Sequence, residues 1–190
     1  MIRLLGVATL KRKAVVLNAR PYIGNADGAA KSSRAGMDEF IKQCIKHSGG
    51  VFWNNGSFTV RDMRGKPGVI STHSTGRAVD LSWRFMPNHK DASNSKGKPK
   101  SRQQARRFIN TLTKNGNLFG LQIAIDYWPK PFGAAWRCDR QAWKRYKTKT
   151  VSGAPKGDWF HIELNPEMAD NPDLVKAAFN QVFGKSTTQP

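Results

Sequence analysis

Two short segments of the chain carry side chains that could bind a metal ion. The segment "STHSTGRAVD", residues 71–80, places His73 and Asp80 seven positions apart, and "DWFHIEL", residues 158–164, adds His161. Two imidazoles and one carboxylate, with a fourth position left to water, are the ligands of a catalytic zinc site. Cobalt and manganese also accept such donors. The alternative is structural: His73 in a turn, Asp80 on the surface and His161 as an ordinary strand histidine.

These ligands can meet only if two predicted strands pair. Residues 76–82 and 158–164 both have the composition of strands, in which successive side chains point to opposite faces. Each strand then has one apolar face for a core and one face that presents Asp80 or His161. If the two strands pair in one sheet, His73, Asp80 and His161 can converge over its open face.

The same two segments resemble the motifs of a known family. "STHSTGRAVDL" resembles the Ser-x-His-x-x-Gly-x-Ala-x-Asp motif of the zinc D,D-peptidases. "GDWFHIEL" resembles their second motif, in which an acidic residue and two aromatic or similar residues precede the last zinc-binding histidine. The family contains D-Ala-D-Ala carboxypeptidases and dipeptidases, and the L-alanyl-D-glutamate endopeptidases that serve as phage endolysins. The resemblance covers the chain from Phe58 to Leu164 and implies a hedgehog-like fold.

The resemblance implies a role for each matched residue. His73, Asp80 and His161 would hold one Zn²⁺ per chain, which lowers the pKa of its bound water to roughly 7. Asp158 would take a proton from this water as it attacks a peptide carbonyl, and would pass it to the leaving amine. Glu163, on the strand face of His161, is the rival base or a partner to an imidazole. Many members carry Glu at the position of Asp158, and the Asp is similar to that of some phage endopeptidases.

Substrate contacts are expected upstream of the first motif. The family uses an arginine there to hold the substrate or its oxyanion, and Arg61 looks like that residue, with Arg64 as the alternative. Ser71 is expected beside the metal site, as a substrate-binding or supporting hydroxyl or as a turn residue. The tryptophans of residues 127–157 could wall the cleft, although most tryptophans lie in cores.

The rest of the sequence predicts an α+β domain in which a small antiparallel sheet carries the zinc site and about three helices flank it. Apolar stripes and caps predict helices at 37–48, 101–116 and 171–184. Ser101 and Gln104 form a capping box for the second helix, and Asn171 with Pro172 begins the third. A hairpin around an Asn55-Gly56 turn and a strand at 120–126 are further expected elements.

Long basic loops connect these elements. Residues 84–100 and 127–157 contain many Lys and Arg side chains, and we predict that both are loops. Residues 1–184 are expected to form a single zinc-peptidase domain, and 185–190 a disordered tail. Cys44 and Cys138 form no CxxC zinc pattern. Cys44 lies on the apolar stripe of a predicted helix, so a buried free thiol is expected there, and one bridge to Cys138 is possible.

The formal charge of +19 favours polyanionic partners. We expect peptidoglycan stem peptides as the substrate, and anionic wall polymers or lipid head groups as further partners of a monomer. No specific nucleic acid is expected. The first residues, "MIRLLGVATLKRK", fit a secretory signal poorly, because the charge follows a short apolar run. Synthesis in a host cytoplasm and action on the wall after release are therefore expected, with secretion by another route as the alternative.

The sequence thus predicts a zinc-dependent peptidoglycan peptidase, a hydrolase that cuts a stem-peptide amide bond involving a D-amino acid. A phage endolysin fits best, and both L-alanyl-D-glutamate endopeptidase and D,D-carboxypeptidase activities are compatible with the motifs. The alternative is a basic module that binds nucleic acid or cell wall without catalysis, through the basic and aromatic segments 84–107 and 130–149.

Overall fold

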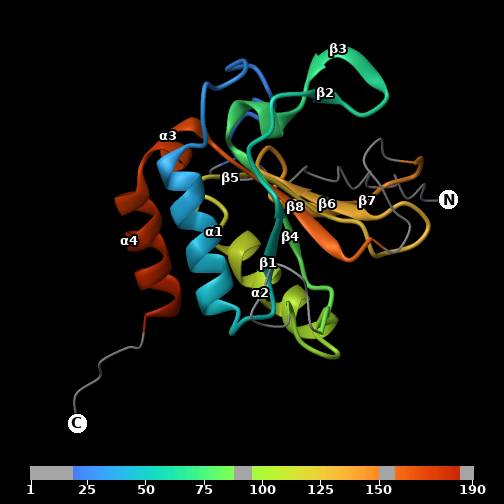
Figure 1. The fold of residues 1–190 in the computed structure, drawn as a ribbon, viewed down its shortest axis with the longest axis vertical. Helices are drawn as coiled ribbons and strands as arrows, with labels where there is room; N and C mark the ends of the chain where they lie inside the picture. The colour runs from blue at the N-terminus through green and yellow to red at the C-terminus, as the bar shows by residue number, and fades with distance from the viewer. Residues whose placement is uncertain (1–18, 88–95, 150–156, 185–190) are drawn as a thin grey trace, which may run out of the picture.

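A computed structural model describes residues 19–87, 96–149 and 157–184, and its fold is α+β, as the sequence predicts (Figure 1). The predicted tail 185–190 and parts of both predicted loops, residues 88–95 and 150–156, lie outside the described residues. The helices are α1 (Ala35–His47), α2 (Arg102–Lys114), α3 (Pro166–Asp170) and α4 (Pro172–Phe183), with a 3₁₀ turn, η1, at Thr72–Thr75. The strands are β1 (Trp53–Gly56), β2 (Asp62–Met63), β3 (Lys66–Ile70), β4 (Ala78–Ser82), β5 (Leu121–Asp126), β6 (Ala134–Arg137), β7 (Ala142–Arg145) and β8 (Trp159–Leu164).

Six of the strands form one antiparallel sheet in the order β1-β4-β8-β5-β6-β7, and β2 and β3 form a separate hairpin. The predicted pairing of the two motif strands is confirmed, because β4 lies beside β8. In their register Asp80 is opposite His161, and Ala78 is opposite Glu163. The polar faces of the two motif strands therefore lie on the same side of the sheet.

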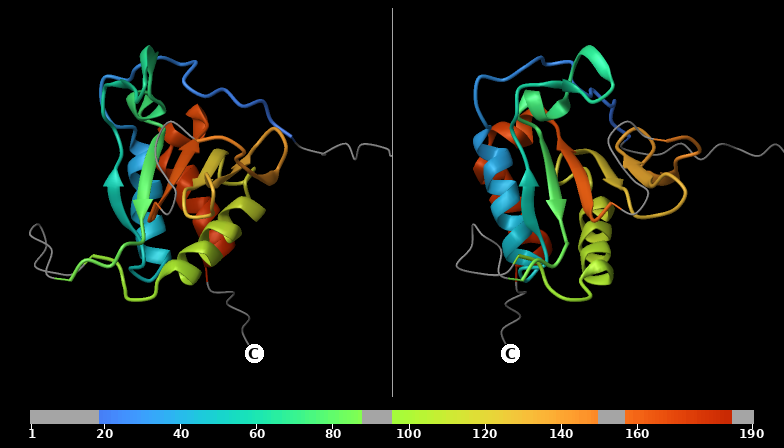
Figure 2. Two further views of the ribbon diagram at one scale, coloured as in Figure 1. Left: turned by 90° about the vertical axis from the view of Figure 1, so that its right-hand side faces the viewer. Right: turned by 45° about the vertical axis from the view of Figure 1, so that its right-hand side comes forward.

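The other face of this sheet forms the core. Val79, Leu81, Phe160 and Ile162 point to that face and are buried in the core. The helices cover this face of the sheet (Figure 2). The helices contribute the apolar stripes that the sequence predicts, including Met37, Phe40, Cys44, Ala105, Phe108, Ile109, Leu112, Val175, Ala178 and Phe179. Because the core covers one face of these central strands, their opposite face is open to carry a site.

The predicted start of the last helix is confirmed. The side chain of Asn171 accepts hydrogen bonds from the backbone N–H groups of Asp173 and Leu174, and Pro172 occupies the first turn of α4. The capping box predicted for α2 is wrong. Ser101 is at the cap position, but its hydroxyl donates to the carbonyl of Trp83 at 2.5 Å, so it does not cap the helix.

Two predictions about the strands are corrected. Asn55 and Gly56 do not turn a hairpin, because they belong to β1, which pairs with the distant β4 instead of with residues 57–61. Residues 127–157 are not one long loop, since they contain β6 and β7. These strands are only four residues each: β6 is buried except for Arg137, and β7 carries the exposed Lys144 and Arg145, so neither shows a regular apolar alternation. The sheet is accordingly larger than expected.

Both cysteines are buried and free, so the possible Cys44–Cys138 bridge is not formed. The short helix α3 makes a fourth helix beside the about three that were expected. No helix in the described part of the chain has the length and apolarity needed to cross a membrane.

Candidate metal centre

His73 is held by a short turn that the first motif encodes. Ser71 is buried at the N-cap of η1, where its hydroxyl accepts a hydrogen bond from the backbone N–H of His73 at 3.3 Å. Gly76 ends the turn with a φ of 72°, in the left-handed region that favours glycine. A Cβ atom at this position would also lie 3.1 Å from Arg34 Cγ. The turn therefore leads directly into β4 and places His73 above the open face of the sheet.

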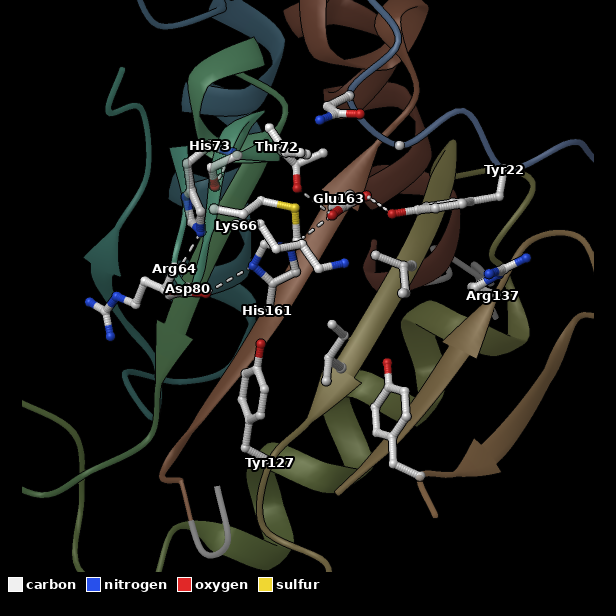
Figure 3. A pocket seen from close by; sticks show the side chains of 18 of the residues that line it. Tyr22, Arg64, Lys66, Thr72, His73, Asp80, Tyr127, Arg137, His161 and Glu163 are labelled. Carbon is white, nitrogen blue, oxygen red and sulfur yellow. Dashed lines mark hydrogen bonds and ion pairs between the residues drawn. The ribbon is translucent and has the colours of Figure 1, made fainter. Parts of the chain in front are cut away.

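Three potential ligands converge on that face. His161 Nδ1 lies 3.0 Å from Asp80 Oδ1, and His73 Nε2 lies 3.5 Å from Asp80 Oδ2 (Figure 3). One donor atom from each residue can be chosen so that all three lie within 4.8 Å of one another. Donors about 2.1 Å from a tetrahedral ion are about 3.4 Å apart. This buried His–Asp–His group could therefore hold a metal ion.

The outer nitrogen of each imidazole has its own hydrogen-bond partner. His73 Nδ1 lies 2.8 Å from the carbonyl oxygen of Ser57, and His161 Nε2 lies 2.9 Å from Glu163 Oε1. If these outer nitrogens donate, the lone pairs of His73 Nε2 and His161 Nδ1 are left to face Asp80. Metal-binding histidines in proteins are oriented in this way by an acceptor on the second nitrogen. The arrangement is therefore compatible with a bound metal ion.

Glu163 is the centre of a buried hydrogen-bond network. Its Oε1 accepts from the Thr72 hydroxyl at 2.6 Å, and its Oε2 accepts from the Tyr22 hydroxyl at 3.0 Å. Burial raises the pKa of Glu163. The hydrogen bond and charge of His161, together with the hydrogen bonds from Thr72 and Tyr22, outweigh burial and lower the pKa. Glu163 is therefore a fixed anion that orients His161.

The pKa values of the two central ligands move in opposite directions. Burial raises the pKa of Asp80, but hydrogen bonds from His161 and His73 outweigh burial and lower it below its usual range. Burial lowers the pKa of His161, but hydrogen bonds to Asp80 and Glu163 outweigh burial and raise it to about 10. In the absence of a metal ion, the imidazolium of His161 therefore lies between two carboxylates. A metal cation would take over the charge that this proton supplies.

A buried ion pair fixes the segment that brings Tyr22 to this network. The guanidinium of Arg77 is fully buried and donates to both carboxylate oxygens of Asp27, at 2.8 and 2.7 Å. Arg77 also donates to the carbonyls of Leu164 and Gly24. Because Arg77 lies one residue before β4, this pair connects the N-terminal segment directly to the strand that carries Asp80.

The candidate metal centre lies in a cavity of about 980 Å³ whose lining is strongly cationic. Of the described residues that line it, two are acidic, Asp80 and Glu163. Nine are basic: Arg61, Arg64, Lys66, Arg137, Arg140, Lys144, Arg145, Lys147 and Lys149. These cations come from two separate regions, the β2–β3 hairpin and the β6–β7 pair. An anionic ligand can thus be contacted from both sides of the three potential ligands.

The structure places both arginines predicted to hold the substrate, Arg61 and Arg64, in the lining of this cavity. Ser71 is also in the lining, where its hydroxyl supports the turn of His73. Asp158 is different. Its carboxylate lies 3.1 Å from Arg84 Nε, and Asp158 is not among the described residues that line the cavity.

The tryptophans predicted as possible cleft walls do not form them. Trp136 is buried in the core, Trp143 packs against the core, and Trp128 lines another cavity. Among the tryptophans of the described residues, Trp159 is the one that reaches the cavity of the metal centre.

Sequence reasoning missed Ser57, Thr72 and Tyr22, which complete the centre. Thr72 stands beside His73 in the motif, and this adjacency was the one usable signal. Tyr22 is 141 positions from Glu163, and Ser57 contributes only a backbone carbonyl, so no local pattern marks either of them.

Comparison of this chain with models of known protein families, with curated proteins and with solved structures finds no match.

Proposed function

We propose that the protein is a zinc-dependent peptidase that hydrolyses an amide bond in the stem peptides of peptidoglycan. The observation that carries this proposal is the convergence of His73, Asp80 and His161 at one point of a large cationic cavity. Two imidazoles and one carboxylate leave room for water and substrate, which is typical of catalytic zinc sites. Zinc bound there would supply Lewis-acid chemistry, polarising a carbonyl and activating water.

The cavity supports an anionic peptide as the substrate. Stem peptides carry several carboxylates, and the nine basic residues of the lining offer partners for them on both sides of the centre. Arg61 and Arg64 are the arginines of the lining that lie nearest in sequence to the first motif. We assign them to binding a substrate carboxylate or the developing oxyanion.

Two carboxylates are candidates for the group that takes a proton from the attacking water. Glu163 already accepts hydrogen bonds from Thr72, Tyr22 and His161 and has a lowered pKa, so its role is to position His161. Asp158 makes one ion pair with Arg84, whose side chain is 45% exposed. Such exposed pairs contribute little free energy and break easily. We assign proton transfer to Asp158, and this role requires its carboxylate to turn from Arg84 toward the cavity.

The test is digestion of purified peptidoglycan, followed by mass spectrometry of the soluble fragments. We expect fragments from the zinc-loaded protein, and the mass of the new termini identifies the bond. His73→Ala, Asp80→Ala and chelated protein should release none, whereas His47→Ala, which removes an imidazole outside the cavity, should remain active. Full hydrolysis after chelation, or by His73→Ala, would reject the proposal.

A further inference from the structure

A second cavity, of about 870 Å³, lies on the opposite face of the sheet from the metal centre. Trp83 follows the end of β4 and continues the core face of Val79 and Leu81, whereas Asp80 points to the metal centre. Trp128, after β5, likewise follows the face of Asp126. The first two turns of α2 and the residues just before this helix form the rest of the lining, together with Phe85. Because side chains alternate along a strand, the two cavities open on opposite sides.

The second cavity carries an excess of positive charge. Its lining includes Lys98, Lys100, Arg102, Arg106 and Arg107. The fully buried carboxylate of Asp126 accepts from Arg102 at 2.6 Å and from Arg106 at 3.0 Å, so two of these charges share one partner. Among the described residues, Lys98, Lys100 and Arg107 form no ion pair. The start of α2, which no side chain caps, adds the positive end of a helix dipole.

Unpaired donors in the lining also indicate a missing acceptor. Within residues 19–87, 96–149 and 157–184, three buried side-chain nitrogens have no hydrogen-bond partner. Two of the three, Trp83 Nε1 and Arg102 Nη1, belong to residues of this cavity, and Trp83 is only 9% exposed. Buried donors are normally satisfied by protein, water or a bound ligand. Their presence here favours a ligand rich in acceptor oxygens.

Two aromatic rings give the cavity an apolar wall as well. The side chains of Phe85 and Trp128 are 41% and 39% exposed. Among the exposed large hydrophobic residues of the described chain, these two are the aromatic ones. Trp128 packs edge to face against Trp83, with ring centroids 5.1 Å apart. Half-exposed rings beside cations can contact the carbon atoms of a ligand whose charged groups bind the cations.

We propose that this second cavity binds the phosphodiester groups of an anionic wall polymer, such as a poly(polyol phosphate). Phosphodiester oxygens are acceptors only, which matches a lining of cations and unpaired donors. The short carbon units between phosphates would lie against Phe85 and Trp128. Nucleobases would bring donors that need acceptors, but the carboxylate of Asp126 is already bonded to Arg102 and Arg106. Anion binding stands on this geometry alone, and the choice of a wall polymer rests on the proposed function.

The test compares two variants with equal loss of charge. The cavity variant combines Lys98→Gln, Lys100→Gln and Arg107→Gln, and the control combines Lys31→Gln, Lys46→Gln and Lys114→Gln. All six residues are exposed, and the control residues line neither cavity. Binding of a fluorescent poly(glycerol phosphate) at low ionic strength is measured by anisotropy. We expect the cavity variant to bind about tenfold or more weakly than the native protein, and the control to change by about twofold, because phosphate contacts act locally.

Equal losses in the two variants would overturn the proposal, because binding would then follow net charge. An oligothymidylate with the same number of phosphates and vesicles of an anionic phospholipid serve as competing probes. Tighter binding of either, lost in the same cavity variant, would assign the cavity to nucleic acid or to a membrane instead. His73→Ala separates the two proposals, because it should lose hydrolysis and keep polymer binding. A protein that binds the polymer through this cavity but never binds zinc would reject the proposed function alone.

Discussion

Asp80 and His161 are direct partners in the β4–β8 register, and His161 Nδ1 lies 3.0 Å from Asp80 Oδ1. This pairing does not depend on a loop, because both residues belong to central strands whose other faces are buried in the core. His73 comes from the turn immediately before β4. The positions of all three side chains are therefore set by the fold before any ion binds, and the predictions below use this rigidity.

Glu163→Ala should weaken zinc binding. Loss of the carboxylate frees the His161 ring and leaves the hydroxyls of Thr72 and Tyr22 without their acceptor. Removing such a supporting group reduces metal affinity about 10- to 100-fold. Glu163→Gln, which keeps an acceptor oxygen, should recover part of the loss, and Glu167→Ala on the exposed surface of α3 should have no effect. Competition with a chromogenic chelator measures each affinity. Unchanged affinity in Glu163→Ala would show that Glu163 does not position the ligand.

Zinc binding should release a proton at neutral pH. The raised pKa of His161, about 10, means that the metal-free imidazole is protonated on both nitrogens below that pH. Coordination through Nδ1 displaces one of these protons. Affinity should therefore increase with pH up to about pH 10, by about tenfold per pH unit for one proton. Titration calorimetry in buffers of different ionisation enthalpy counts the protons released. A count of zero at neutral pH would contradict the displacement of a proton from His161.

Asp158→Asn should abolish most hydrolysis while zinc remains bound. A general base contributes a factor of about 10² to 10⁴ in rate. Arg84→Gln removes the partner of Asp158 and should retain activity, because the carboxylate is then free to turn toward the cavity. Rates on purified peptidoglycan are measured together with the zinc content of each variant. If Asp158→Asn is fully active and a zinc-loaded Glu163→Gln is not, the base is Glu163.

Asp27→Asn should destabilise the protein at neutral pH. The variant leaves the fully buried guanidinium of Arg77 without its anion, and loss of one partner of a buried pair costs about 3 kcal/mol or more. Burial raises the pKa of Asp27, but the hydrogen bonds and charge of Arg77 outweigh it and lower the pKa. The charged carboxylate therefore stabilises the fold above about pH 4, and this contribution is lost as the pH falls through the lowered pKa.

Urea unfolding of Asp27→Asn and the native protein at several pH values tests this prediction. The difference between their free energies of unfolding should be largest at neutral pH and should decrease in acid. Asp170→Asn is the matched control, because Asp170 is 61% exposed and forms a longer pair, at 3.4 Å, with Arg34. Its effect should stay below about 0.5 kcal/mol. A difference for Asp27→Asn that grows toward acid would contradict the ion-pair explanation.

The parts of the fold that the sequence predicts are those with strong periodicity. The alternation in residues 76–82 and 158–164 predicts both motif strands and their polar faces, and the helical stripes predict α1, α2 and α4. The strands β6 and β7 are not predicted, because four residues are too few to show alternation, β6 is buried on both faces and β7 ends in two consecutive basic residues. The Asn55-Gly56 signal was misleading because β1 gains its hydrogen bonds from β4, a partner distant in sequence.

The candidate metal centre is predictable from the sequence in its three potential ligands and not in its supporting groups. His73, Asp80 and His161 belong to two local patterns, so their types and faces indicate a shared site. The hydrogen bond from Tyr22 to Glu163 depends on how the N-terminal segment crosses the sheet, which Arg77 and Asp27 decide. The direction of the Asp158 side chain depends on where β8 begins, and strand ends are not fixed by periodicity.

The register of β4 against β8 has a consequence for length changes in the first motif. Inserting or deleting a single amino acid between Gly76 and Asp80 would move each following side chain of β4 to the opposite face of the sheet. Asp80 would then be forced among the apolar helices, and Leu81 would be pushed out above the sheet. A single insertion or deletion would thus move Asp80 away from the two histidines, expose core residues and displace Trp83 at the same time. The length of this segment is therefore less tolerant of mutation than any one of its side chains.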